Sequence, residues 1–104
     1  LHPLVVSPAW QRQGIGSRLV DVLEQWVKAQ GGLTITLGSD DKHNQTSLGG
    51  VDLYANLWER IRTIHNLNGH PYEFYQKLGY TITGVVPDAN GYGKPDILMA
   101  KRIV

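Results

Sequence analysis

The residues best suited to carry chemistry in this chain lie between positions 11 and 17, where Gln-Arg-Gln-Gly-Ile-Gly-Ser opens a helical pattern. Gly14 and Gly16 leave backbone amides uncovered where the first N–H groups of a helix lack intrahelical partners. These donors and the helix dipole bind anions, and Arg12 and Arg18 add positive charge beside them. The pattern predicts a site for a phosphorylated ligand. A glycine-rich turn that only starts a helix is the alternative.

Two well-known phosphate loops do not fit these residues. A dinucleotide fingerprint requires a third glycine where this chain has Leu19, and a Walker loop requires Gly-Lys-Ser/Thr, which is absent. The stretch from Gln11 to Gly16 instead resembles the Gln/Arg-x-x-Gly-x-Gly/Ala loop of the GNAT superfamily of acetyltransferases, which holds the pyrophosphate of acetyl-CoA. This resemblance implies acetyl-CoA as the phosphorylated ligand.

A strand and an amphipathic helix must position this loop. Residues 4–6 form an apolar run that Pro8 ends, and residues 33–37 form a second strand pattern. Strand, helix and strand at this spacing predict a parallel pair with a crossover, which places the loop at the carboxyl end of the first strand. Apolar residues at helical spacing predict the buried face of the helix, with Glu24 on the polar side and Gly31-Gly32 at its end. They are Ile15, Leu19, Val22, Leu23 and Trp26, widened by Val20 and Val27.

The second half of the chain predicts two further helices and a hairpin. A helix is expected over residues 51–65, with Tyr54 and Trp58 on its apolar face as core residues or, alternatively, as a dimer contact. Pro71 and Gly79 frame a short helix. Strands over residues 80–86 and 97–104, joined by a turn-rich loop, should pair antiparallel.

The short helix makes the resemblance more specific. Residues 71–80, Pro-Tyr-Glu-Phe-Tyr-Gln-Lys-Leu-Gly-Tyr, match the second GNAT signature, which carries Phe-Tyr and closes on Leu-Gly-Phe/Tyr before the penultimate strand. Leu-His-Pro-Leu-Val-Val at residues 1–6, and Asn-Gly with Lys-Pro-Asp-Ile over residues 90–97, are similar to the aminoglycoside 6'-N-acetyltransferase branch. The match extends over essentially the whole chain.

The resemblance implies an α/β fold, α+β in some schemes, with a GNAT-like mixed sheet, helices on both faces, and the amino-terminal strands and helices absent. Residues 1–104 would be the carboxyl-terminal portion of a single N-acetyltransferase domain. A strand at residues 4–6 would then have an unpaired edge, so we expect an oligomer, in the simplest case a homodimer, or a docked amino-terminal part.

Roles for individual residues follow from the same resemblance. The backbone of Leu4, Val5 and Val6 would pair with the pantetheine arm, and the amide of Leu4 would polarise the thioester carbonyl. Asn66 would contact the pantetheine, and Tyr75 would face the departing thiolate. A phenol has an ordinary pKa of about 10, so it can donate a proton to that sulfur at neutral pH. Core packing is the alternative for Tyr75. The amides that would hold the pyrophosphate belong to Arg12, Gln13, Gly14, Ile15, Gly16 and Ser17.

The acceptor side is less defined. Asp40 and Asp41 can attract a cationic substrate, and a solvated turn capped by Asp is the alternative. His2 and His70 are candidate bases by chemistry, but a structural hydrogen bond is the preferred interpretation for each, and no general base can be assigned. The histidines lack metal-ligand spacing, so we expect no metal.

Composition narrows the remaining classes. A chain of 104 residues with 41% hydrophobic and 18% charged residues fits one globular domain. Its net charge of +1, without a basic stripe, argues against a nucleic-acid partner. The absence of cysteine, of a membrane-length apolar run and of a signal peptide predicts a cytoplasmic protein without a membrane partner.

The resemblance therefore implies an acetyl-CoA-dependent N-acetyltransferase that modifies an aminoglycoside amine and so confers antibiotic resistance. Three alternatives remain open: an acetyltransferase for a polyamine or protein amine, a non-catalytic CoA-binding or assembly module, and an inert fragment.

Overall fold

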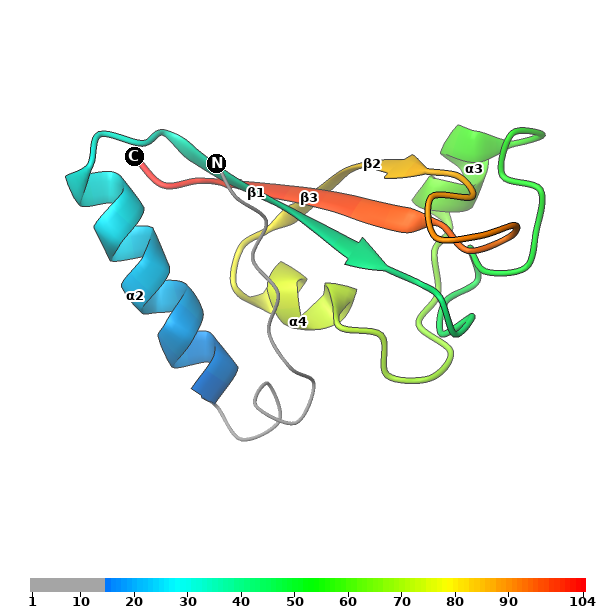
Figure 1. Ribbon diagram of the computed structural model, residues 1–104, viewed down its shortest axis with the longest axis horizontal. Helices are drawn as coiled ribbons and strands as arrows, with labels where there is room; N and C mark the ends of the chain where they lie inside the picture. Colours follow the sequence, from blue (N-terminus) through cyan, green and yellow to red (C-terminus); the bar gives the residue numbers. More distant parts are fainter. Residues whose placement is uncertain (1–14) are drawn as a thin grey trace.

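A three-stranded antiparallel sheet forms the framework of the computed structural model, which describes residues 15–104. The strands are β1 (Thr34–Asp40), β2 (Thr81–Val86) and β3 (Asp96–Arg102), in the order β1-β3-β2. The helices are α2 (Ile15–Ala29), α3 (Leu57–Arg62) and α4 (Tyr72–Lys77). Figure 1 shows α2 and α4 on the same side of the sheet, and α3 at the end where β1 and β2 finish.

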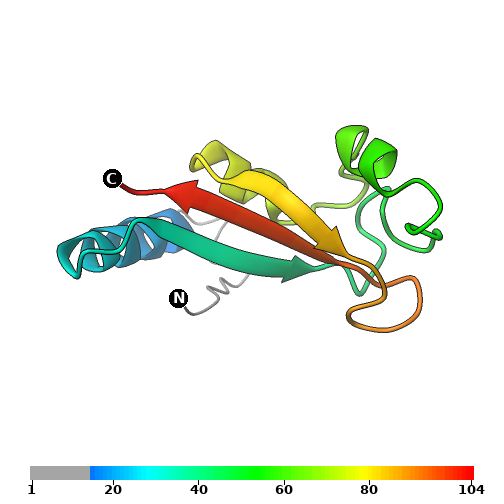
Figure 2. The same cartoon turned by 90° about the horizontal axis from the view of Figure 1, so that it is seen from above.

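The sheet buries one face because apolar side chains alternate along β1 and β3. Ile35 and Leu37 of β1 lie on the same face as Ile97 and Met99 of β3, and all four are nearly inaccessible to solvent. The expected hairpin of β2 and β3 is confirmed, with a bulge between Ile82 and Gly84. Figure 2 shows β3 between its two neighbours, so β1 pairs with a strand far from it in sequence. The predicted parallel strand at residues 4–6 lies outside the described residues.

Helix α2 confirms the expected helix and its stop signal. Its last turn closes when Gly32 N–H donates to the carbonyl of Val27 and Gly31 N–H donates to that of Lys28. Gly31 adopts a φ of +83°, a conformation that glycine reaches without steric cost. The two glycines therefore end the helix and turn the chain toward β1.

The buried face of α2 differs from the expected one. Val20 and Val27 are buried, whereas Leu19, Val22 and Trp26 are 42%, 66% and 61% exposed. The prediction that these three form the core stripe is wrong for the described residues. Compared with the expected orientation, α2 turns a different side toward the sheet. Glu24, which was assigned to the polar side, points inward and binds the side chains of Tyr80 and Lys101.

Glu24 links α2 to β3 and to the residue before β2. Tyr80 donates its hydroxyl proton to Glu24 Oε2 at 3.0 Å, and Lys101 Nζ lies 2.9 Å from Glu24 Oε1. The ammonium group of Lys101 also lies 5.7 Å from the centre of the Tyr80 ring. A carboxylate with two partners tolerates partial burial. Burial, then the hydrogen bond and negative charge of Glu24, raises the pKa of Tyr80 above its ordinary value.

We expect this raised pKa to make stability fall in alkali. Above pH of about 10 the unfolded chain releases the Tyr80 proton while the folded chain retains it, so the free energy of unfolding falls with pH. The contribution of one proton is about 1.4 kcal/mol per pH unit. Urea denaturation between about pH 8 and 11 should give a smaller fall for Tyr80→Phe than for the wild type. Tyr92→Phe is the control because Tyr92 is 93% exposed, and equal falls in the two variants would contradict the prediction.

Helix α3 is much shorter than the helix expected over residues 51–65. Asp52 instead starts a turn: its Oδ1 accepts from Tyr54 N–H at 3.2 Å and its carbonyl from Ala55 N–H at 3.4 Å. Such local bonds compete with helix formation. Tyr54 and Trp58 are 73% and 72% exposed, so their assignment to the core is wrong. The alternative of a dimer contact for these two remains a prediction.

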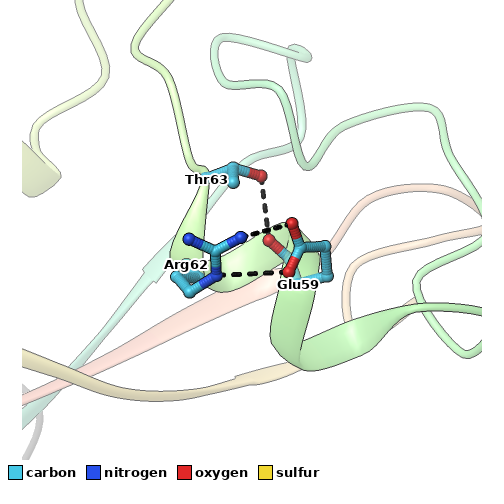
Figure 3. A network of polar contacts seen from close by, with 3 residues as sticks. All are labelled: Glu59, Arg62 and Thr63. Carbon is cyan, nitrogen blue, oxygen red and sulfur yellow. Dashed lines mark hydrogen bonds and ion pairs between the residues drawn. The ribbon is translucent and has the colours of Figure 1, made fainter.

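The carboxyl end of α3 is held by local polar contacts (Figure 3). Arg62 makes two hydrogen bonds to the carboxylate of Glu59, at 2.6 and 3.2 Å, and the Thr63 hydroxyl donates to the Glu59 carbonyl at 2.8 Å. Both side chains of the ion pair are mostly exposed, so the pair contributes little to stability. These bonds end the helix locally, and the chain then returns toward the sheet.

The second face of the sheet carries no helix among residues 15–104, because α2 and α4 both lie against the other face. Helices were expected on both faces, and within the described part of the chain they cover only one. No helix in the described part is long and apolar enough to cross a membrane.

Candidate functional site

Most of the predicted site residues that the structure describes gather where β1 ends and α4 begins. Asp40 is the last residue of β1, Asp41 follows it, and Tyr75 lies on α4. His70, two residues before α4, reaches the Asp40 carbonyl with its ring. Asn66 in turn contacts the backbone of His70. The fold therefore joins residues that are far apart in the sequence.

Asp41 holds the loop after β1. Its carboxylate is fully buried and accepts hydrogen bonds from Gln45 N–H, Thr46 N–H and the Thr46 hydroxyl, at 2.6, 3.1 and 2.8 Å. The hydroxyl oxygen of Thr46 in turn accepts a hydrogen bond from Leu48 N–H. Of the two adjacent aspartates, only Asp40 presents its carboxylate to solvent, so Asp41 matches the capping alternative.

Replacing Asp41 by alanine should lower the free energy of unfolding by about 3 kcal/mol, because three donors inside the loop lose their acceptor. Asp40→Ala is the matched control and should change stability by less than about 0.5 kcal/mol, since that side chain is exposed. Urea denaturation of both variants measures the difference. Equal stability of the two variants would show that the loop does not depend on Asp41.

Asp40 faces a second carboxylate, Asp96, across β1 and β3. Burial, then the negative charge of Asp40, raises the pKa of Asp96 above its ordinary value. Like charges directly opposite each other in a sheet repel, so this pair is a local concentration of negative charge. It borders a shallow hollow of about 400 Å³ on the open face of the sheet. The hollow is lined by Thr36, Leu37, Gly38, Thr83, Asp96, Leu98 and Met99.

Sequence reasoning missed Asp96, because only the register of β1 on β3 places it opposite Asp40. One signal was present in Gly38, a glycine inside a strand pattern. A Cβ atom at Gly38 would lie 2.6 Å from Oδ2 of Asp96, so the glycine leaves room for that carboxylate.

Asn66 braces the turn before α4. Its Oδ1 accepts from His70 N–H at 2.8 Å, and its Nδ2 donates to the His70 carbonyl at 2.9 Å. The side chain is half-buried. The contact with pantetheine that the resemblance implies for Asn66 remains a prediction.

Tyr75 lies in the aromatic part of the core. The side chain is 3% exposed, and its ring meets those of Phe74 and Tyr80 edge to face, at centroid distances of 5.1 and 5.8 Å. Such contacts fix the ring plane and so the direction of the hydroxyl. Core packing is therefore present, and it is compatible with a hydroxyl held in a set direction.

The predicted pyrophosphate loop is described only at its end. Ile15, Gly16 and Ser17 form the first turn of α2, in which Gly16 is buried and Ser17 half-buried. The first turn of a helix carries unpaired amides, as an anion site requires. The other cofactor residues, Leu4, Val5, Val6, Arg12, Gln13 and Gly14, lie outside the described residues, as does His2.

His70 has the structural hydrogen bonds expected of it. The ring is 2% exposed, and both its nitrogens lie within hydrogen-bond distance of backbone groups. Across residues 15–104 no three His, Cys, Asp or Glu side chains are grouped closely enough to hold a metal ion.

Comparisons with known proteins show that the chain belongs to the acetyltransferase (GNAT) family. The family model matches residues 1–57. The aminoglycoside 6'-N-acetyltransferase from Enterococcus faecium is 53% identical with a TM-score of 0.90, and the match covers 100% of this chain and 58% of that one.

Two further solved structures resemble the chain. An aminoglycoside 6'-N-acetyltransferase complexed with coenzyme A is 52% identical with a TM-score of 0.90, over 99% of this chain and 57% of that one. An aminoglycoside 6'-acetyltransferase type Ii is 45% identical with a TM-score of 0.63, over 100% of this chain and 52% of that one. No curated protein sequence matches. The chain thus spans less than three fifths of these relatives, and the family that its two signatures predict is confirmed.

Proposed function

We propose that this chain is the carboxyl-terminal portion of an N-acetyltransferase that moves the acetyl group of acetyl-CoA to an amine of an aminoglycoside. The observation that carries the proposal is the likeness of the whole chain to two aminoglycoside 6'-N-acetyltransferases at 52% and 53% identity. One of those proteins is complexed with coenzyme A, which supports acetyl-CoA as the co-substrate.

Acetyl transfer requires an unprotonated amine, a polarised thioester carbonyl and a proton for the leaving sulfur. The lone pair of an unprotonated amine attacks the thioester carbonyl, and the carbon–sulfur bond breaks. The sulfur takes up a proton and leaves as the thiol of CoA, and the amine nitrogen releases a proton to water. The backbone amide of Leu4 would polarise the carbonyl. The Tyr75 hydroxyl would donate its proton to the sulfur as negative charge develops there.

The cofactor would lie along the residues that the resemblance implies. Main-chain groups of Leu4, Val5 and Val6 would pair with the pantetheine, and Asn66 would contact it. Amides from Arg12 through Ser17, with Gln13, Gly14, Ile15 and Gly16 between them, would hold the pyrophosphate. A glycine at position 16, in the first turn of α2, supports this, because a position without a side chain lets a phosphate approach the backbone.

The acceptor would be held by negative charge at the end of β1. An aminoglycoside carries several ammonium groups, and the exposed Asp40 opposite Asp96 offers two carboxylates beside the hollow on the open face. Asp41 would act by fixing the loop. A polyamine or a protein amine is the second candidate acceptor, because a carboxylate pair selects for positive charge and not for a sugar.

Further properties follow if the proposal holds. Acetylation replaces an ammonium group by a neutral amide, which would weaken an aminoglycoside and confer resistance. We further infer a cytoplasmic enzyme, where acetyl-CoA is made, and a homodimer to which the exposed Tyr54 and Trp58 can contribute aromatic contacts.

Release of free CoA thiol from acetyl-CoA tests the function. The acceptors are an aminoglycoside with a 6'-amine, one with a 6'-hydroxyl, spermidine and a short peptide. Of these four acceptors, we expect turnover only with the aminoglycoside that has a 6'-amine. Turnover with spermidine or peptide would favour the second candidate. Coenzyme A binding without turnover would favour a non-catalytic module, and the absence of both would overturn the proposal.

A further inference from the structure

A single imidazole connects the end of β1 to the start of α4. His70 is 2% exposed, with Nε2 2.8 Å from the Asp40 carbonyl oxygen and Nδ1 3.0 Å from the backbone nitrogen of Tyr72. The His70 and Tyr72 rings also lie 5.6 Å apart. Thirty residues separate His70 from Asp40, so this contact is made only in the folded chain.

The partners fix the direction of both hydrogen bonds. The Asp40 carbonyl can only accept, so Nε2 of His70 carries the hydrogen and donates it. The Tyr72 N–H can only donate, so Nδ1 is the acceptor. Both ring nitrogens are thus occupied in a buried site, and His70 is not placed to take a proton from an acceptor amine.

The hydrogen bond to Tyr72 does the work of a helix cap. Helix α4 has only six residues, and its N-cap residue, Pro71, makes no side-chain capping bond. Amides in the first turn of a helix need an acceptor from outside it, which Nδ1 supplies to Tyr72. Tyr75 is one turn further along this helix, so the cap helps to fix the element that carries the Tyr75 hydroxyl.

The hydrogen bond to Asp40 fixes the other side of the site. Its carbonyl is held by His70 Nε2, while its exposed carboxylate faces that of Asp96. Asn66 braces the arrangement by bonding both the N–H and the carbonyl of His70. The His70 ring is therefore hydrogen-bonded both to Asp40, which is proposed to bind the acceptor, and to α4, which carries the Tyr75 hydroxyl proposed to protonate the sulfur.

We propose that His70 is a positioning residue that sets the placement of Asp40 relative to Tyr75, and so aligns the acceptor amine with the departing thiolate. This inference rests on the function proposed above. Catalysis requires such alignment, because a displacement of about 1 Å can reduce a rate by roughly a hundredfold. His70 acts through its two neighbours and does not itself touch the reacting atoms.

Two substitutions separate the two hydrogen bonds. Asparagine places its amide oxygen where Nδ1 lies, so His70→Asn keeps the bond to Tyr72 and loses that to Asp40. Glutamine places its amide nitrogen near Nε2, so His70→Gln keeps the bond to Asp40 and loses the helix cap. We expect His70→Asn to raise the acceptor KM about tenfold with kcat little changed, and His70→Gln to lower kcat about tenfold with KM little changed.

Controls and a second measurement complete the experiment. His65→Asn and His65→Gln change an exposed histidine and should leave both constants unchanged. Hydrogen exchange of the Tyr72 amide needs no turnover, and it should accelerate in His70→Gln but not in His70→Asn. The positioning role would be overturned if the Tyr72 amide exchanged equally fast in the two variants. It would also be overturned if the wild type were active and both substitutions changed KM and kcat in the same way. Neither result would affect the proposed function. A wild type that neither binds acetyl-CoA nor transfers its acetyl group would overturn the proposed function and this inference with it.

Discussion

Gly16→Val should abolish coenzyme A binding and leave the domain folded. Gly16 is buried in the first turn of α2, where the pyrophosphate is proposed to meet backbone amides. Two branched methyl groups at this position would cover those amides and keep the phosphates away. Loss of two charge-assisted hydrogen bonds, each contributing about 1.5–3 kcal/mol, lowers affinity by at least about a hundredfold. Titration calorimetry with coenzyme A measures the change.

The helix itself should survive this substitution. Valine is a better helix former than glycine by a few tenths of a kcal/mol, roughly, so the substitution does not remove the propensity for α2. Gly84→Val is the matched control, because a Cβ atom on Gly84 of β2 meets nothing within 4 Å and its φ is not positive. Circular dichroism should give folded spectra for both variants. Unchanged coenzyme A affinity in folded Gly16→Val would place the pyrophosphate elsewhere.

Tyr75→Phe should slow acetyl transfer while acetyl-CoA affinity stays nearly the same. The hydroxyl matters mainly as negative charge develops on the leaving sulfur, so its loss raises the barrier without weakening the ground-state complex. General-acid catalysis is typically worth at least about a hundredfold, so kcat should fall by about that factor. Single-turnover measurements with a 6'-amino aminoglycoside isolate the chemical step.

Tyr72→Phe is the matched control for Tyr75. Tyr72 lies one turn earlier on α4 and is similarly buried, at 4% exposed against 3%. Removal of its hydroxyl tests whether the loss of any buried phenol on this helix affects the rate. If Tyr75→Phe retained the wild-type single-turnover rate, Tyr75 would be a core residue only. If both substitutions reduced the single-turnover rate by the same factor, the reduction would come from altered packing of α4 and not from a lost proton donor.

The sequence determined several local elements of this protein, although not the length of α3, and the family to which it belongs. The stop at Gly31-Gly32, the short helix framed by Pro71 and Gly79, and the hairpin of β2 and β3 were predicted correctly, because each depends on neighbouring residues with strong conformational preferences. The two signatures predicted the family for a related reason. They are short, contiguous and tied to local backbone shape.

Only the tertiary structure decided which residues meet. Helical periodicity defined an apolar sector on α2, but the inward direction of Glu24 depends on Tyr80 and Lys101, which are 56 and 77 residues away. The same holds for Asp40. Strand register places it opposite Asp96, and its carbonyl forms a hydrogen bond with His70, which is thirty residues away in the sequence. Such contacts depend on how elements pack across the whole chain, and a pattern within a short window carries no information about that packing.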